Sequence, residues 1–391
     1  MTPLEYGTPT ESELDPLGAI LSQAFAFPPD DARPWIERTG RENARVVRSA
    51  AGVVAGLLVY PMAQWFGGRS VSMAGIAGVG TDPAAQGLGA GTRLLRATVA
   101  DLAQSGFALS CLYPATQPLY RRAGYEQAGS RCTIRVLAEH LALGDRGLPL
   151  RQAAPADQAA IHALHRRVAS RRNGSIDRTP LLWLRITEPW HGRRRTGYVV
   201  ERDGALEGYC YVARRQKPGG RQELEVADLA AETPQAATRL LSFLGDHRSL
   251  ADEAIWHGGP DDPLLLLVRE PRYRLEIEDV WMLRLLDVKR AFEGRGFPAG
   301  LSATLELEVY DEVLPANRGR WLVEIRGGEA RARPGGDGRL KAHVRGLASL
   351  YAGHRSAEAL ALTGLLEGEA GVLEEATAAF AGPHPSMSDF F

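Results

Sequence analysis

The chain has little of what marks secreted, membrane-bound or metal-binding proteins. Cysteine occurs three times in 391 residues, and no two cysteines have C-x-x-C spacing. This argues against a disulfide framework and a zinc site, so we expect no metal. No apolar run approaches the length of a membrane span, and the first residues lack the basic start and apolar core of a signal peptide. We therefore expect a cytoplasmic protein without a membrane partner.

Neither sign of charge dominates the chain. Lysine and arginine total 46 and aspartate and glutamate total 47, which leaves a formal net charge of −1. Such a chain has no long-range field to attract nucleic acid, so we expect a small-molecule function and no nucleic-acid partner. The arginine runs at 166–167, 171–172 and 193–195 are predicted to be solvated surface. The chain is too long for one compact core, and we predict three domains.

A glycine-rich junction at residues 73–95 is the most informative feature present. An apolar run ending at Val79 predicts a strand, and the spacing of apolar residues over 92–102 predicts a helix. The loop between them is Gln86-Gly87-Leu88-Gly89-Ala90-Gly91. Its glycines let backbone N–H groups surround an anion without interference from Cβ atoms, and the helix adds its positive end. The junction predicts a site for a pyrophosphate-bearing ligand.

The order of predicted elements repeats along the chain. The first segment is predicted to contain an amphipathic helix at 12–27, a hairpin at 45–60 and the junction at 73–95. A helix at 157–168, a hairpin at 196–212 and a strand-to-helix junction at 223–241 follow in the same order. The second junction has no glycine loop, so we interpret it as a structural copy without the anion site. From about residue 288, alternation with period two predicts a small antiparallel sheet, and helical segments follow it.

Two motifs together resemble those of the GCN5-related N-acetyltransferases. Residues 86–91 fit the pattern Gln/Arg-x-x-Gly-x-Gly/Ala, and Tyr120-Arg-Arg-Ala-Gly-Tyr125 resembles the Tyr-x-x-x-Gly-Phe/Tyr segment of that family. Two such repeats followed by a domain similar to sterol carrier proteins look like the enhanced-intracellular-survival (Eis) family. The resemblance implies an α/β (α+β) fold class, with a catalytic acetyltransferase domain at 1–145, a degenerate acetyltransferase-like domain at 146–287 and a sterol-carrier-like domain at 288–391.

The resemblance also implies an activity and an assembly. Members of the family transfer an acetyl group from acetyl-CoA to a primary amine, and aminoglycosides and lysine side chains are among their acceptors. For this chain the acceptor stays open among an aminoglycoside, a polyamine, a peptide lysine and a metabolite amine. The family is usually hexameric, so we expect a homo-oligomer.

The same resemblance assigns roles to individual residues. Tyr120 matches the general acid of the family, and the carboxylate of Phe391 matches a C-terminal group that reaches the active site. A phenol of ordinary pKa about 10 can protonate a thiolate whose ordinary pKa is about 8.5. The backbone at Val79 would polarise the thioester carbonyl. The cofactor-binding residues would be Val79, Gln86, Gly87, Leu88, Gly89, Ala90 and Gly91.

The resemblance further implies that the first helix and the loop after it line the channel for the acceptor. Phe25, Asp31 and Trp35 lie there, and aromatic and acidic side chains suit a cationic amine. The alternative is a non-catalytic CoA- or lipid-binding module, which would release no thiol from acetyl-CoA with any amine. A dinucleotide-binding fold is disfavoured because the loop lacks G-x-G-x-x-G spacing.

Overall fold

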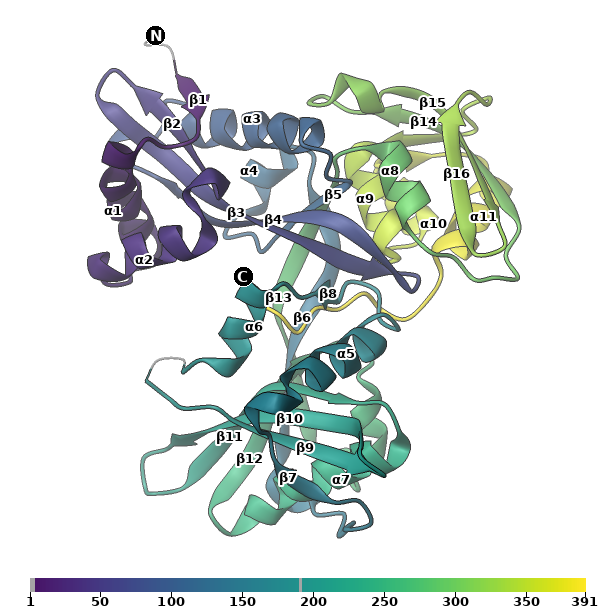
Figure 1. The fold of residues 1–391 in the computed structure, drawn as a ribbon. Coiled ribbons are helices and arrows are strands. Elements are labelled where there is room, and N and C mark those ends of the chain that lie inside the picture. The colour runs from purple at the N-terminus through teal and green to yellow at the C-terminus, as the bar shows by residue number, and fades with distance from the viewer. Residues whose placement is uncertain (1–3, 190–191) are drawn as a thin grey trace. The chain divides into compact units, whose positions relative to one another are not determined.

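The computed structural model describes residues 4–189 and 192–391, which form two compact units (Figure 1). The first unit extends to Gly129 and also includes Val280–Gly382 and Phe391, and the second comprises Ser130–Asp279 and Pro383–Phe390. Each unit is therefore built from separate stretches of the chain. Across the described residues, no helix is both long and apolar enough to cross a membrane.

The first repeat forms one mixed sheet with helices on its two faces. Its strands pair in the order β1-β2-β3-β4-β5-β13, in which β4 and β5 are parallel and the other pairs antiparallel. The elements up to β6 are β1 (Glu5–Gly7), α1 (Leu14–Phe25), α2 (Pro29–Thr39), β2 (Ala44–Ser49), β3 (Gly52–Phe66), β4 (Arg69–Thr81), α3 (Ala90–Gln104), β5 (Leu109–Leu112), α4 (Gln117–Arg121) and β6 (Glu126–Leu137).

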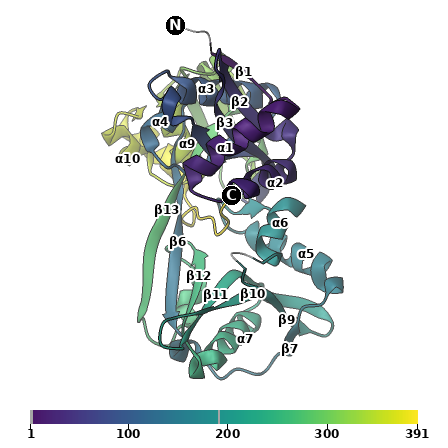
Figure 2. The ribbon, with the colours of Figure 1, turned by 90° about the vertical axis from the view of Figure 1, so that its left-hand side faces the viewer.

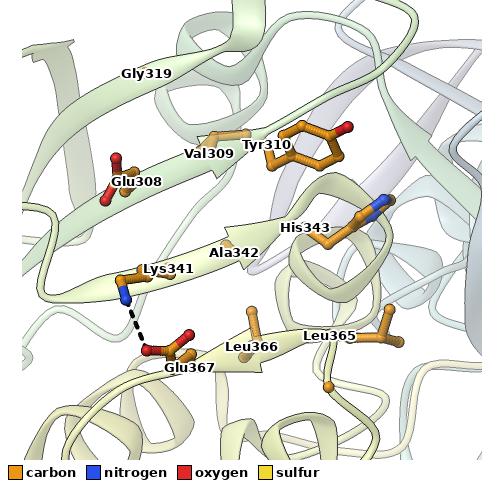
Figure 3. Close-up of a pocket in the computed structure, with 11 residues that line it drawn as sticks. Glu308, Val309, Tyr310, Gly319, Lys341, Ala342, His343, Leu365, Leu366 and Glu367 are labelled. Atoms are coloured by element: carbon orange, nitrogen blue, oxygen red, sulfur yellow. Dashed lines mark hydrogen bonds and ion pairs between the residues drawn. The ribbon is translucent and has the colours of Figure 1, made fainter.

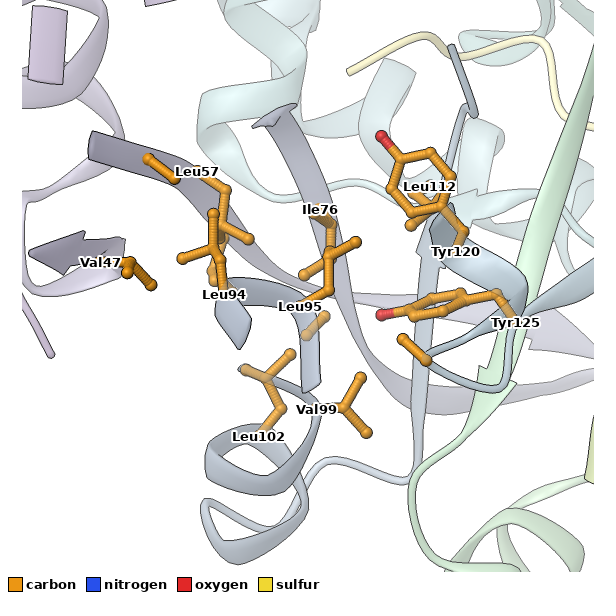
Figure 4. Packing of buried hydrophobic residues seen from close by; sticks show 14 of the residues in the cluster. Val47, Leu57, Ile76, Leu94, Leu95, Val99, Leu102, Leu112, Tyr120 and Tyr125 are labelled. Carbon is orange, nitrogen blue, oxygen red and sulfur yellow. The ribbon is translucent and has the colours of Figure 1, made fainter. Parts of the chain in front are cut away.

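Alternation along the strands sends side chains to the two helical layers. Val47, Leu57 and Ile76 are buried in one cluster with the apolar face of α3 (Figure 4). On the other face, a Cβ on Gly56 would lie 2.2 Å from Leu17 of α1, so this glycine permits the close packing of α1 on β3. The predicted amphipathic helices therefore cover the two faces of the sheet.

The second repeat has the same layered organisation. Its elements are β7 (Leu150–Gln152), α5 (Gln158–Ala169), β8 (Ile176–Asp177), α6 (Pro180–Thr187), β9 (Thr196–Arg202), β10 (Ala205–Gln216), β11 (Gln222–Ala231), α7 (Pro234–Gly245), β12 (Ala251–Gly258) and β13 (Tyr273–Leu285). Within this unit the strands pair in the order β6-β12-β11-β10-β9-β7. Val200 and Cys210 pack with α7, whereas Val199 and Tyr209 pack with α5, on the opposite face (Figure 2).

The third segment forms a five-stranded sheet in the order β16-β15-β14-β17-β18. Its elements are α8 (Val288–Gly294), β14 (Ala303–Tyr310), β15 (Gly319–Arg326), β16 (Glu329–Pro334), β17 (Leu340–His343), α9 (Val344–Ala352), α10 (Ala357–Leu362), β18 (Leu366–Glu367) and α11 (Ala370–Phe380). The prediction of a purely antiparallel sheet was wrong, because β14 and β17 are parallel. Period-two alternation reports which face is buried and carries no information on strand direction.

A buried arginine joins the third segment to the first repeat inside the first unit. Arg295 is 3% exposed, and its guanidinium carbon lies 5.0–5.7 Å from the ring centroids of Phe66, Phe297, Tyr351 and Phe380. Burial lowers the pKa of Arg295 to about 10, so it remains a cation at neutral pH. It also donates a hydrogen bond to the carbonyl of Tyr351. Four aromatic faces thus stabilise one desolvated cation.

Candidate active site

The glycine-rich loop lies between β4 and α3 and is open to solvent. Gly87 and Gly89 have φ values of 83° and 79°, which disfavour any residue with a side chain. A Cβ at either position would meet open space, and Leu88 is 53% exposed. α3 begins at Ala90, and Gly89 at its N-cap has no side chain with which to cap it. The first N–H groups of α3 are therefore available to an anion.

A β-bulge interrupts β4 shortly before this loop. Gly80 pairs with Gly56 and Ala77 pairs with Leu58, so Gly78 and Val79 together face the single residue Leu57. Gly78 has φ 61°, and a Cβ there would lie 2.8 Å from the ring of Trp35. A bulge takes one residue out of the strand ladder and redirects its backbone groups. Val79 therefore occupies a position where its N–H can serve a ligand.

Tyr120 lies in α4 and is 4% exposed. Its ring packs in the cluster between the sheet and α3, beside Leu112 at the end of β5 (Figure 4). Burial raises the pKa of the Tyr120 hydroxyl to about 12, so the phenol is protonated at physiological pH. A Cβ on Gly91 would lie 3.8 Å from Leu119, which places α4 next to the first turn of α3. Tyr120 and the glycine loop therefore belong to adjoining elements.

The backbone conformation and close packing at Gly124 explain why the Tyr-x-x-x-Gly segment has a glycine at this position. Gly124 has φ 89°, and a Cβ there would lie 2.8 Å from the guanidinium of Arg284. Arg284 is fully buried and its Nη2 donates to both carboxylate oxygens of Asp311, at 2.7 and 2.6 Å. The hydroxyl of Tyr125 lies 2.7 Å from Ser110 Oγ. This part of the motif holds the segment after Tyr120 in place.

The last residue of the chain is buried in the first unit. Phe391 is 6% exposed, and its ring centroid lies 6.3 Å from that of Tyr60 and 5.8 Å from that of Tyr113. A Cβ on Gly75 of β4 would approach the Phe391 ring to 2.7 Å, so the absence of a side chain at Gly75 makes room for it. Gly75 pairs with Cys111 of β5. Phe391 thus packs over the paired part of β4 and β5.

The aromatic residues expected to bind the acceptor adjoin the bulge and Phe391. Trp35 Nε1 donates to the hydroxyl of Tyr60 at 2.7 Å, and the rings of Phe25 and Trp35 meet edge to face at 6.4 Å. Phe25 is 49% exposed and can therefore contact a ligand. Asp31 lies exposed in the first turn of α2.

Three residues of this region were not predicted from the sequence. Tyr60, Tyr113 and Gly75 surround Phe391, yet each reads locally as an ordinary strand residue. The one available signal was Gly75 within an otherwise apolar strand, since a strand glycine often marks a close approach.

In the second unit, the C-terminal tail enters a buried ion network. Arg178, with 1% of its side chain exposed, donates from Nε to Asp389 at 2.7 Å and from Nη1 and Nη2 to Asp228. Tyr209 donates to Asp228 at 2.6 Å. Burial alone would raise the pKa of Asp228, but the charge and hydrogen bonds of Arg178 lower it to about 2. His165 is buried beside Tyr209, and burial lowers its pKa to about 4.

A hollow of about 320 Å³ lies in the five-stranded sheet (Figure 3). All of its lining residues belong to the stretch from Glu308 to Glu367. Lys341 Nζ and Glu367 form an ion pair at 2.7 Å across two strands, and the Tyr310 and His343 rings lie 5.5 Å apart. The lining thus combines an exposed ion pair with two aromatic rings.

Comparison with known proteins agrees with this architecture. Residues 5–128 and 174–285 each match a GNAT acetyltransferase domain, and residues 288–388 match a sterol carrier protein domain. A Streptomyces avermitilis protein named as an uncharacterized N-acetyltransferase is 31% identical over 335 residues, which cover 80% of each chain. The structure of a GCN5-related N-acetyltransferase from Anabaena variabilis is 34% identical, covers 100% of both chains and has a TM-score of 0.96. The chain belongs to the GCN5-related N-acetyltransferase family.

Family membership confirms the predicted fold class of two GCN5-related acetyltransferase folds followed by a sterol-carrier-like domain. It also identifies the chain as an N-acetyltransferase. GCN5-related acetyltransferases use acetyl-CoA as donor. The structure of Eis1 from Mycobacterium abscessus covers 100% of both chains with a TM-score of 0.80 at 24% identity. That likeness shows a shared fold.

Proposed function

We propose that this acetyltransferase transfers the acetyl group of acetyl-CoA to a primary amine of an aminoglycoside, a polyamine or a lysine side chain, as a member of the Eis family. The observation that carries the proposal is the burial of Phe391 against Gly75 of β4, in the unit that also contains the glycine loop and Tyr120. The carboxylate of Phe391, next to β4, would supply a negative charge for a cationic acceptor.

The donor would be held by backbone groups. The N–H groups from Gln86 to Gly91 would bind the pyrophosphate, because the loop is exposed, glycine-rich and followed by the positive end of α3. The N–H of Val79 at the bulge would donate to the thioester carbonyl oxygen and stabilise the negative charge that develops there. The donor set thus fits acetyl-CoA.

Two groups would carry out the proton transfers: the carboxylate of Phe391 and the hydroxyl of Tyr120. The Phe391 carboxylate accepts a proton from the acceptor ammonium, directly or through water, and the free amine attacks the thioester carbon. The new C–N bond forms, the C–S bond breaks, and the Tyr120 hydroxyl protonates the leaving thiolate. With a pKa of about 12, Tyr120 is always available as a donor but is a weak acid, so the proton moves as the C–S bond breaks.

The acceptor would bind among aromatic side chains. Phe25 and Trp35 offer ring faces to a cation, and Trp35 is positioned by its hydrogen bond to Tyr60 beside Phe391. Asp31 would add negative charge at the exposed edge of α2. An acceptor with several ammonium groups fits such a surface better than a metabolite that carries a single amine. The metabolite amine therefore ranks last among the acceptors.

A one-residue extension tests the role of the terminal carboxylate. Adding glycine after Phe391 moves the carboxylate by about 3.5 Å, and we expect at least a tenfold loss of kcat with the Kd for acetyl-CoA unchanged. The matched control adds one glycine in the exposed turn at Gly219–Gly220 of the second unit. Thiol release and calorimetry are measured on both proteins. Unchanged kcat in the extended protein would remove Phe391 from the mechanism.

A panel of amines then tests the substrate class. Thiol release from acetyl-CoA is measured with an aminoglycoside, spermidine, a lysine peptide and a small metabolite amine. We expect the polycationic acceptors to give the highest kcat/KM. Zero turnover with every amine, together with normal acetyl-CoA affinity, would favour the non-catalytic CoA-binding module.

The remaining features are proposed from the resemblance to the Eis family. These are the domain boundaries at 145/146 and 287/288, assembly into a hexamer, and a cytoplasmic location. Size-exclusion chromatography with light scattering tests the hexamer directly. A monomer at micromolar concentration would contradict it.

A further inference from the structure

A second cavity, of about 640 Å³, lies in the first unit between the acetyltransferase domain and the sterol-carrier-like domain. It is lined by residues of α4, the start of β6, α9 and α10, and by the loop before α10. These lining residues have no part in the proposed acetyl transfer. The volume is that of a site for a small organic molecule.

The charged residues that line this cavity are three arginines and one glutamate. Arg121 Nη2 donates to Glu126 Oε1 at 2.7 Å, and Arg345 Nε donates to Glu126 Oε2 at 2.9 Å. Burial disfavours the charge on Glu126, but these hydrogen bonds lower its pKa, so it is ionised at neutral pH. Arg355 adds a third guanidinium. The lining therefore holds three guanidinium groups and one carboxylate, which leaves an excess of positive charge.

A buried hydroxyl in the same lining lacks a partner. Ser349 of α9 is 1% exposed, and its Oγ has no hydrogen-bond partner among residues 4–189 and 192–391. An unpaired buried hydroxyl is unfavourable, and a ligand oxygen in the cavity would satisfy it.

The lining also includes apolar side chains. Ala359, Leu360, Leu362 and Leu365 contribute to it, and Leu362 is 88% exposed. A large apolar side chain that is so exposed at the edge of a cavity gains by covering an apolar ligand group. The cavity therefore has a cationic part and an apolar part.

We propose that this cavity binds a small amphipathic anion, whose carboxylate or phosphate pairs with Arg121, Arg345 and Arg355 while its hydrocarbon part covers Leu360 and Leu362. Ser349 donates a hydrogen bond to the anionic group. Guanidinium groups favour planar or tetrahedral oxyanions of this kind because they donate in a fork. The proposal is independent of the acetyl acceptor.

Calorimetry of the full chain tests the ligand class. Octanoate and octyl phosphate are the probes, and they distinguish the two headgroups. We expect at least one of them to bind, acetate and inorganic phosphate to bind at least tenfold more weakly, and octylammonium to show no binding. Equal affinity for the headgroup alone and for its octyl derivative would overturn the amphipathic assignment, and so would the absence of binding by both octyl anions.

Variants of lining residues test whether the octyl anions bind in this cavity. Leu362→Asp places a charged carboxylate in the apolar part of the cavity, where the hydrocarbon part of the ligand would lie, and should lower the affinity about tenfold. Leu266→Asp, at an equally exposed leucine of the second unit, should not change it. Arg355→Met should weaken binding by a similar factor, with Arg122→Met as its exposed control. Wild-type affinity in Leu362→Asp, or displacement of the octyl anion by saturating acetyl-CoA, would place the site elsewhere.

Discussion

The two acetyltransferase repeats differ most at the junction between their central strand and the following helix. In the first repeat, residues 82–89 separate β4 from α3, and the helix begins after a glycine. In the second, only residues 232–233 separate β11 from α7, and Thr233 Oγ1 accepts from the N–H of Ala236 at 3.2 Å. Glu232 is paired with Arg167. The second helix has its own cap and an acidic neighbour, so an anion gains little there.

The strand bulge is retained in both repeats but has different surroundings. In the second repeat, Tyr211 pairs with Asp228 and Val212 with Val226, so Ala227 is the extra residue of β11. Asp228 beside it is bonded to Arg178, which also binds Asp389 of the C-terminal tail. The same strand distortion that takes Val79 out of the regular pairing in the first repeat therefore adjoins a buried ion network in the second. A duplicated fold can lose a ligand site and keep its backbone geometry.

Among the substitutions that compare the two repeats, we expect replacement of the loop glycine Gly89 to have the largest effect, which is on acetyl-CoA binding. Gly89→Glu puts a side chain at φ 79° and a carboxylate at the start of α3, so we expect no measurable binding of acetyl-CoA by calorimetry. Gly204→Glu, at φ 82° in the β9–β10 turn with equally open space, should leave binding unchanged. Normal affinity in Gly89→Glu would mean that the donor binds away from this loop.

The ion network of the second repeat should dominate its stability. Arg178→Met leaves Asp228 and Asp389 buried without their cation, and we expect the free energy of unfolding to fall by about 3–5 kcal/mol in urea. The comparison in the first repeat is Arg45→Met, which breaks a partly buried pair with Asp101, whose side chain is 34% exposed, and should cost about 1 kcal/mol. Equal losses of unfolding free energy in the two variants would show that the deeper burial of the Arg178 network does not make it more important for stability.

Acid should weaken the same network. The pKa of Asp228 is about 2 in the folded chain and about 3.9 when unfolded, so its contribution is present above pH 4 and is lost as the pH falls towards 2. The expected loss is roughly 2 kcal/mol. Urea unfolding at several pH values, on the wild type and on Asp228→Asn, measures it. The same acid slope in both proteins would show that other carboxylates are responsible.

Removal of the Tyr120 hydroxyl should affect transfer and leave binding intact. We expect Tyr120→Phe to lower kcat about a hundredfold with little change in the Kd for acetyl-CoA, because only proton donation is lost. Tyr310→Phe, at an exposed tyrosine of the third domain, is the control. Since the pKa of Tyr120 is about 12, its ionisation should not limit the rate below that pH. A variant with full thiol release would assign Tyr120 to packing.

The helix cap of the second repeat should give the smallest effect. Thr233→Ala removes the acceptor for the N–H of Ala236 and should cost about 1 kcal/mol of unfolding free energy in urea. Acetyl-CoA affinity should be unchanged, since we expect the donor to bind at the glycine loop of the first repeat. A change in that affinity would mean that the second repeat takes part in donor binding.

Local patterns were sufficient for most of the fold and for part of the site. Periodicity predicted the helices, the hairpins and the open loop at residues 86–91, because these depend on neighbouring residues. The residues that surround Phe391 could not be predicted from the sequence, because Tyr60 and Tyr113 are far from it in sequence and contact it only in the folded chain. The pairing of Arg178 with Asp389 is equally remote in sequence. Contacts between side chains that are far apart in sequence produce no periodic pattern from which they could be predicted.

The aromatic cage around Arg295 limits how freely the third domain can be separated from the first. Phe66 comes from β3, whereas Phe297, Tyr351 and Phe380 come from the last hundred residues. Cutting the chain near residue 288, or grafting the third domain onto another acetyltransferase, would remove the Phe66 ring and open the buried cation to solvent on that side. The two domains should therefore melt as one cooperative block, and recombination that exchanges them must carry all five side chains together.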